Sequence, residues 1–138
     1  MTEREEVFNY MKNCGVLFLA TVKGDKPKNR PIGFRMLVND QIYFLTGESK
    51  EVNAQMIKNT NVEFVGLADG EFIRYYGRVV FDEDQDKSLL KKAFEVMPML
   101  ENLYGENSDN KAVIFHVSKA TAEIRDMFSV KKAYNFIN

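Results

Sequence analysis

Residues 29–46, NRPIGFRMLVNDQIYFLT, have the sequence pattern of a β-hairpin. Apolar side chains occupy every second position of its first half, at Ile32, Phe34, Met36 and Val38. This period of two predicts a strand with one apolar face. Asn39-Asp40 is typical of a two-residue hairpin turn, and residues 41–46 (QIYFLT) return as an apolar strand. We therefore expect two antiparallel strands, over 29–38 and 41–46.

Other strands flank this hairpin on both sides. Upstream, VLFLATV (16–22) is apolar on both faces, and KGDKP (23–27) reads as a turn. Downstream strands are expected at 61–69, 71–81, 111–117 and 121–128. Gly77 lies inside the long strand 71–81, where a bend or bulge is expected. The tail from Val130 shows no clear period.

Helices are predicted in three places. Thr2 and Glu5 form a capping-box pattern before an amphipathic helix, which Gly15 can end in a left-handed conformation. A short helix is expected over 49–58. A longer one begins at Asp84 and breaks at Met97-Pro98-Met99, before a short helical piece over 100–104.

Closely spaced strands joined by tight turns favour an antiparallel barrel or sandwich. We expect a mainly β, α+β fold of six to seven antiparallel strands with flanking helices, as one domain over residues 1–138.

Composition narrows the classes of function. The formal net charge of −1 argues against general nucleic-acid binding. The first ten residues, MTEREEVFNY, lack the apolar core of a signal peptide, and no run is long enough to cross a bilayer. No membrane association and a cytoplasmic location are therefore expected. The single cysteine, Cys14, and the single histidine, His116, cannot build a zinc site of the usual spacing, so no metal is expected.

The segment Thr46-Gly47-Glu48-Ser49-Lys50 follows an apolar strand and opens the short helix. Helix-start amides, a hydroxyl and a lysine together suit a phosphate. In the predicted hairpin, Arg30 begins the strand that pairs with 41–46, so we expect it near Thr46, Ser49 and Lys50. Ser49 or Thr46 can cap this helix, and the alternative is that Ser49 simply caps it while Lys50 lies in solvent.

Two neighbouring segments complete the candidate site. The backbone of Pro31-Ile32-Gly33-Phe34 can lie against a flat ring, although Gly33 can equally mark a bulge in a curved strand. Residues of the strand 71–81 are candidates for shaping the pocket, namely Arg74, Tyr75 and Tyr76. His116 fits a packed, hydrogen-bonded residue better than a catalyst.

The order of these motifs resembles the pyridoxamine 5'-phosphate oxidase-like, FMN-binding split-barrel family. The similar runs are GVLFLATVKGDKPKNRP (15–31), RPIGF (30–34), YFLTGESKEVNAQMIKNTNVEF (43–64), FIRYYGRVVFDED (72–84) and AVIFHVSKATAEIRD (112–126). The resemblance implies a split β-barrel and a homodimer with FMN at the subunit interface. It implies that Arg30, Thr46, Ser49 and Lys50 hold the phosphate. It further implies that the backbone of Pro31, Ile32, Gly33 and Phe34, together with Leu45, borders the isoalloxazine.

The chain departs from the true pyridoxamine phosphate oxidases because it has no Trp and keeps only Ser49-Lys50 of their Ser-Arg-Lys. It is more similar to the general-stress and nitroimidazole-resistance-like branches. The expected function is an FMN flavoprotein, a flavin-dependent oxidoreductase acting on a small organic acceptor. Three alternatives stay open: a non-catalytic FMN carrier or sensor, a related barrel that binds haem or a deazaflavin, and a dimeric scaffold whose ligand site is dead. In the haem case His116 would be the ligand to test.

Overall fold

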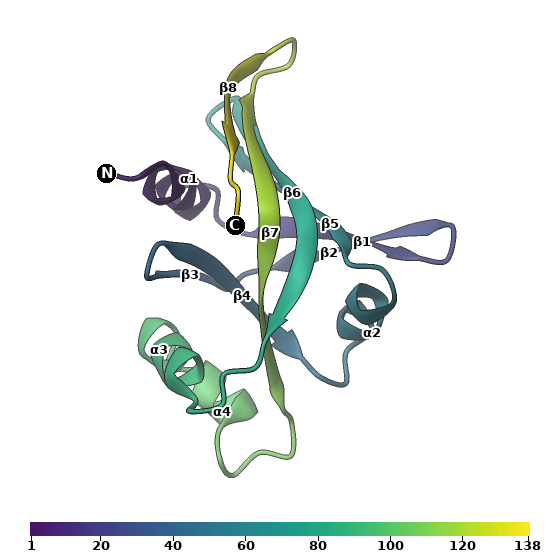
Figure 1. Ribbon diagram of the computed structural model, residues 1–138, viewed down its shortest axis with the longest axis vertical. Coiled ribbons are helices and arrows are strands. Elements are labelled where there is room, and N and C mark those ends of the chain that lie inside the picture. The colour runs from purple at the N-terminus through teal and green to yellow at the C-terminus, as the bar shows by residue number, and fades with distance from the viewer.

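Eight antiparallel strands form one sheet in the computed structural model, which describes residues 1–138 (Figure 1). The strands are β1 (Leu17–Lys23), β2 (Lys26–Ile32), β3 (Arg35–Val38), β4 (Gln41–Gly47), β5 (Asn61–Ala68), β6 (Glu71–Asp82), β7 (Ala112–Arg125) and β8 (Val130–Asn135). Their order is β2-β1-β5-β6-β7-β4-β3, and β8 pairs with β7. The predicted mainly β, α+β class is confirmed, with one strand more than the six to seven expected.

The sheet curls into a barrel that is split between β2 and β3. These two strands occupy opposite ends of the strand order, although only Gly33 and Phe34 separate them in the chain. The barrel is therefore joined there by the covalent chain and not by a ladder of hydrogen bonds. The prediction of one strand over 29–38 is wrong, because β2 pairs with β1 and only β3 pairs with β4.

Turns and irregularities agree with the predicted positions more closely than the strand ends do. Asn39 and Asp40 both have positive φ, as a tight hairpin turn requires. The register of β6 against β7 shifts between Tyr76 and Arg78, which confirms the expected irregularity at Gly77. The two strands predicted over 111–117 and 121–128 are one continuous strand, β7. The tail from Val130, which shows no clear period in the sequence, forms β8.

Four helices accompany the barrel, namely α1 (Glu3–Lys12), α2 (Glu51–Lys58), α3 (Ser88–Val96) and α4 (Leu100–Tyr104). The capping box of Thr2 and Glu5 at α1 is confirmed, and Gly15 follows the helix with φ of 68°. The helix expected from Asp84 begins later, at Ser88. Asp84 instead accepts hydrogen bonds from the backbone amides of Leu89 and Leu90, at 2.9 and 3.0 Å.

The barrel encloses the main hydrophobic core. Side chains of α1 and α2, such as Val7 and Met56, pack with the inner faces of the strands. An aromatic group lies at the centre, where the rings of Phe44 and Phe64 stack with centroids 4.2 Å apart and Tyr75 is fully buried. Tyr75 therefore packs in the core together with Ile73 and Val79 of β6, and it does not shape a pocket as predicted.

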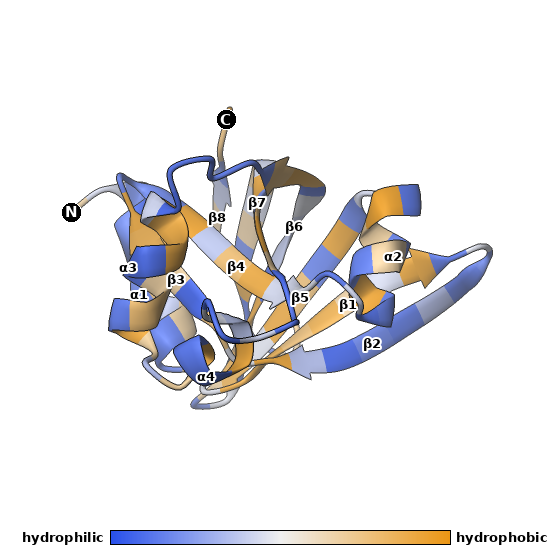
Figure 2. Cartoon of the chain, turned by 90° about the horizontal axis from the view of Figure 1, so that it is seen from below, coloured by the Kyte–Doolittle hydropathy of each residue, from blue (hydrophilic) through white to orange (hydrophobic).

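A second, smaller cluster lies outside the barrel, under α3 and α4. Its buried members are Phe34, Met36, Leu45, Ala93, Leu100 and Ile114. Figure 2 shows the contrast in hydropathy between β4, which is largely apolar, and β2, which is hydrophilic along most of its length. No helix in the structure has the length and apolar character needed to span a membrane.

Candidate functional site

Arg30 is the centre of a small polar network between β2, β1 and α2. It lies opposite Leu19 in the β1–β2 pairing and is half-buried. Its Nη1 donates to Thr21 Oγ1 at 2.6 Å, and its Nη2 donates to Gln55 Oε1 at 2.6 Å. The Thr21 hydroxyl donates in turn to Gln55 Oε1, also at 2.6 Å. Thr21 and Gln55 are themselves buried, so the guanidinium is held in a fixed place.

The charge of this guanidinium is not neutralised by an ion pair. The side-chain partners of Arg30 are a hydroxyl and an amide, both neutral. Burial lowers the pKa of Arg30, and the negative charge of Glu51 opposes that change. Since arginine stays protonated in proteins, the Arg30 guanidinium is a partly buried cation without a neutralising partner. Such a setting favours the binding of an anion.

The start of α2 lies close to this network. Lys50 is the N-cap residue, and no side chain caps the helix. The prediction that Ser49 or Thr46 caps it is therefore wrong, and Ser49 is exposed. The first amides of a helix have no partners within it, and its dipole favours negative charge at that end. Lys50 is exposed and forms no ion pair, so its ammonium is available as well.

The segment proposed to border a flat ring runs from β2 to β3. Pro31 and Gly33 are exposed, and Ile32 is half-buried. A Cβ built on Gly33 would meet nothing within 4 Å, so the chain leaves open space beside this backbone. Gly33 lies at the break between the two strands, and the register shifts of the sheet lie elsewhere, at Gly77 and between Ile124 and Arg125. Phe34 is buried in the second cluster with Leu45, so its side chain supports this segment from beneath.

The structure connects Arg30 to α2 by a different route from the predicted one. Arg30 does not pair with β4, because its strand pairs with β1. It contacts α2 through Gln55, and three residues separate the end of β4 at Gly47 from the start of α2 at Glu51. Thr46 is buried in β4 opposite Val113, and its hydroxyl makes no hydrogen bond within the chain.

Three residues that join this region were not predicted as members of a site. Thr21 and Gln55 orient Arg30. Gln55 follows Val52 by three residues on the buried face of α2, and a polar residue on such a face was the available signal. Tyr104 lies over Gly47, so that a Cβ added to this glycine would be 3.0 Å from the Tyr104 hydroxyl. Burial raises the pKa of the Tyr104 phenol. No local signal in the sequence connects α4 with Gly47.

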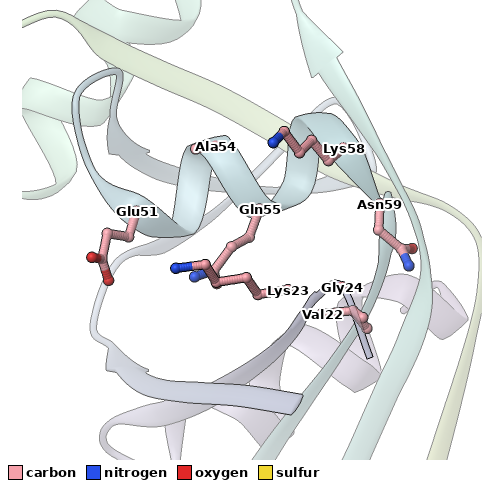
Figure 3. Close-up of a pocket in the computed structure, with 8 residues that line it drawn as sticks. All are labelled: Val22, Lys23, Gly24, Glu51, Ala54, Gln55, Lys58 and Asn59. Carbon is pink, nitrogen blue, oxygen red and sulfur yellow. The ribbon is translucent and has the colours of Figure 1, made fainter. Parts of the chain in front are cut away.

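A groove lies next to Arg30, between α2 and the turn joining β1 to β2 (Figure 3). Its volume is about 440 Å³. The residues that line it are Val22, Lys23, Gly24, Glu51, Ala54, Gln55, Lys58 and Asn59. Gln55 thus contacts Arg30 on one side and the groove on the other.

His116 is a packed and hydrogen-bonded residue, as predicted. Its Nδ1 lies 3.0 and 3.1 Å from the two carboxylate oxygens of Asp82, and its ring meets Tyr43 edge-on at a centroid distance of 5.8 Å. Desolvation and then the charge of Asp82 raise the pKa of Tyr43. These residues lie on β4, β6 and β7, and none of them contacts the network around Arg30.

Comparison with solved structures defines the class of protein. A NimC/NimA family protein from Clostridium acetobutylicum is 27% identical, with a TM-score of 0.85 over 96% of this chain and 92% of that one. General Stress Protein 26 from Bacillus anthracis str. Sterne is 18% identical, with a TM-score of 0.73 over 99% and 100% of the two chains. A pyridoxamine 5'-phosphate oxidase-related, FMN binding protein from Nostoc punctiforme is 16% identical, with a TM-score of 0.60 over 96% and 84%. The chain has the pyridoxamine 5'-phosphate oxidase-like split-barrel fold.

Within that fold, the chain is more similar to the NimC/NimA family protein than to the other two, in both sequence identity and TM-score. No protein-family model matches the chain, and no curated protein matches it. The same fold is also found in a heme binding protein from Mycobacterium smegmatis, at 11% identity and a TM-score of 0.69, with 99% of this chain and 58% of that one covered. Proteins of this fold therefore differ in the group that they bind.

Proposed function

We propose that this chain is an FMN-binding flavoprotein that transfers electrons to a small organic acceptor, as a homodimer with FMN at the subunit interface. The observation that carries the proposal is the Arg30 guanidinium, which is positioned by Thr21 and Gln55 and has no carboxylate partner. The fold that it shares with an FMN binding protein supports the same assignment.

The residues around Arg30 fit a phosphate monoester. Arg30, Lys50 and the start of α2 supply donors and positive charge, and fixed guanidinium donors suit phosphate oxygens. Thr46 adds a hydroxyl without a partner of its own, and Ser49 adds an exposed one. Glu51 is the nearby negative charge that a phosphate would face, and it is exposed and free to turn into solvent.

The remaining site residues would place the ring system. The exposed backbone of Pro31, Ile32 and Gly33 would lie along one face of the isoalloxazine, and the buried pair Phe34 and Leu45 would keep that backbone rigid. When bound, the flavin supplies the electron transfer itself. The chain contributes position and charge, and none of these residues is assigned a proton-transfer role.

A second candidate function is haem binding, which the Asp82–His116 pair favours. The carboxylate fixes the His116 ring through Nδ1 and leaves Nε2 without a partner in the chain, which is how proteins orient a metal-binding imidazole. Flavin and haem differ in visible absorption. One spectrum of the purified protein, repeated after adding FMN and removing the excess, therefore distinguishes the two.

The test of the FMN assignment uses equilibrium titration with FMN. Arg30→Ala and Lys50→Ala should each weaken FMN binding by roughly tenfold or more, since each removes a charged contact to phosphate. Lys26→Ala is the matched control, because Lys26 is exposed and its ammonium pairs only with Asp25. Unchanged FMN affinity in the first two variants would contradict the site. Turnover with a reduced nicotinamide and an acceptor would separate an oxidoreductase from a carrier.

A further inference from the structure

The groove between α2 and the β1–β2 turn offers hydrogen-bond donors that the FMN site does not use. Gln55 makes its hydrogen bonds through Oε1, to Arg30 and Thr21. A guanidinium can only donate, so the Gln55 atom that faces Arg30 must be the oxygen. Its amide nitrogen therefore points away from Arg30 and has no partner in the chain. Gln55 lines the groove, so this nitrogen is a donor open to that space, although only 6% of the residue is exposed.

Positive charge surrounds the same space. Figure 3 shows the Lys23 side chain running beneath α2 toward Gln55, and Lys58 lies further along the helix. Neither lysine forms an ion pair. Glu51 is the one carboxylate that lines the groove, so two positive charges face one negative charge there. This balance and the free amide favour an anionic group.

The position of the groove relative to Arg30 suggests which anion it receives. In the proposed FMN site the isoalloxazine extends from Arg30 toward Pro31 and Gly33. The groove lies in the opposite direction along β2, because Lys23 pairs with Lys26 while Arg30 pairs with Leu19. Lys26 is four residues before Arg30, a distance of about 13 Å along a strand. A ligand that continued past the flavin phosphate would enter the groove.

We propose that this groove receives the second phosphate and the adenosine of a flavin dinucleotide, so that the chain binds FAD as well as FMN. The proposal rests on the proposed function, because it takes Arg30 as the site of the first phosphate. Lys23 and the Gln55 amide hold the second phosphate, and the adenosine lies along α2 toward Lys58 and Asn59. The volume of about 440 Å³ gives this part of the ligand room.

The experiment compares the dissociation constants of FMN and FAD, measured by quenching of flavin fluorescence. The wild-type chain should bind FAD at least as tightly as FMN. The double variant Lys23→Ala/Lys58→Ala should weaken FAD binding by roughly tenfold or more and leave FMN within about twofold. Lys26→Ala/Lys28→Ala is the charge-matched control, because both residues are exposed on β2 and lie outside the groove. It should change neither constant.

The possible outcomes separate this proposal from the proposed function. FMN binding with FAD at least tenfold weaker in the wild-type chain would overturn the dinucleotide site alone. Equal weakening of both flavins by the Lys23/Lys58 pair would also overturn it, since the effect would then be general attraction. Binding of neither flavin would overturn the proposed function, and this inference with it. All four lysines are exposed, so the variants should fold, which thermal unfolding checks.

Discussion

β6 and β7 approach each other closely at Gly77. A Cβ at this position would lie 2.6 Å from Val117 Cγ1 and 2.7 Å from the Ser118 carbonyl oxygen. Gly77→Ala should therefore force the two strands apart and lower the free energy of unfolding by about 1–3 kcal/mol. Chemical denaturation measures this loss. Gly33→Ala is the control, because its Cβ would meet nothing within 4 Å, and it should stay within about 0.5 kcal/mol of the wild type.

Tyr75 gives the molecule a predictable response to alkaline pH. Its hydroxyl is buried without a hydrogen bond of good geometry, and desolvation raises its pKa to about 12, although the charge of nearby Arg4 opposes this. A raised pKa means that the folded state keeps the proton which the unfolded state loses near pH 10. The contribution of Tyr75 to the free energy of unfolding is therefore fully present below pH 10. It falls by about 2–3 kcal/mol as the pH rises toward 12.

The variant Tyr75→Phe removes this titration. Its free energy of unfolding should fall less steeply than that of the wild type between pH 10 and 12. At pH 7 it should be equal or slightly higher, because a buried hydroxyl without a partner is removed. Equal alkaline slopes in the two proteins would show that the hydroxyl has a partner or is solvated.

Among the helices, α3 depends on a residue outside it. Its N-cap, Lys87, has a left-handed conformation and no side-chain capping bond, whereas the Asp84 carboxylate accepts from Leu89 and Leu90. Asp84→Ala should cost about 0.5–2 kcal/mol and speed hydrogen exchange at those two amides. Glu83→Ala should have little effect, because Glu83 is exposed and contacts only Gln85. Equal exchange in both variants would mean that α3 is held by packing alone.

Elements with one buried face were predictable from the sequence, and edge elements were not. β6 alternates on both sides of Gly77 because one of its faces lies in the core, and β4 alternates in its first half and is buried throughout its second. β2 is exposed along most of its length, so its first residues, Lys26 and Pro27, fell within the turn predicted over 23–27. The apolar alternation also runs through Gly33 and Phe34 without a change of phase, so it could not show that the chain leaves one edge of the sheet and joins the other there. β8 is likewise an exposed edge strand with only Tyr134 buried.

The candidate site was predictable in its residue types and not in its contacts. Arg30 and Lys50 stood out as cations near a strand end and a helix start. The partners of Arg30 depend on the pairing of β2 with β1 and on the packing of α2 across the barrel, both of which bring distant parts of the chain together. Tyr104 over Gly47 is a contact of the same kind, and local sequence carries no signal for it.

At the scale of the whole molecule, one face of the barrel is not covered by any of the four helices. A row in register across β2, β1, β5, β6 and β7 contains Pro31, Phe18, Val65, Arg74 and Glu123. All five are exposed or half-buried, and Phe18 is 41% exposed. Neither hydrophobic cluster contains Phe18 or Val65, since α1 and α2 pack into the barrel core and α3 and α4 cover another part of the sheet. This face suits the contact of the proposed homodimer.

We therefore expect that Phe18→Glu converts a dimer into a monomer, because it places a charge where the partner would bury an aromatic ring. Light scattering after size-exclusion chromatography measures the mass. FMN affinity should fall in the same variant, since Phe18 pairs with Pro31, the residue next to Arg30. Ile57→Glu is the matched control, because Ile57 is 62% exposed on α2 and should leave mass and affinity unchanged. A Phe18→Glu protein that remains dimeric would place the contact on another face, and the FMN site would then have to be complete without it.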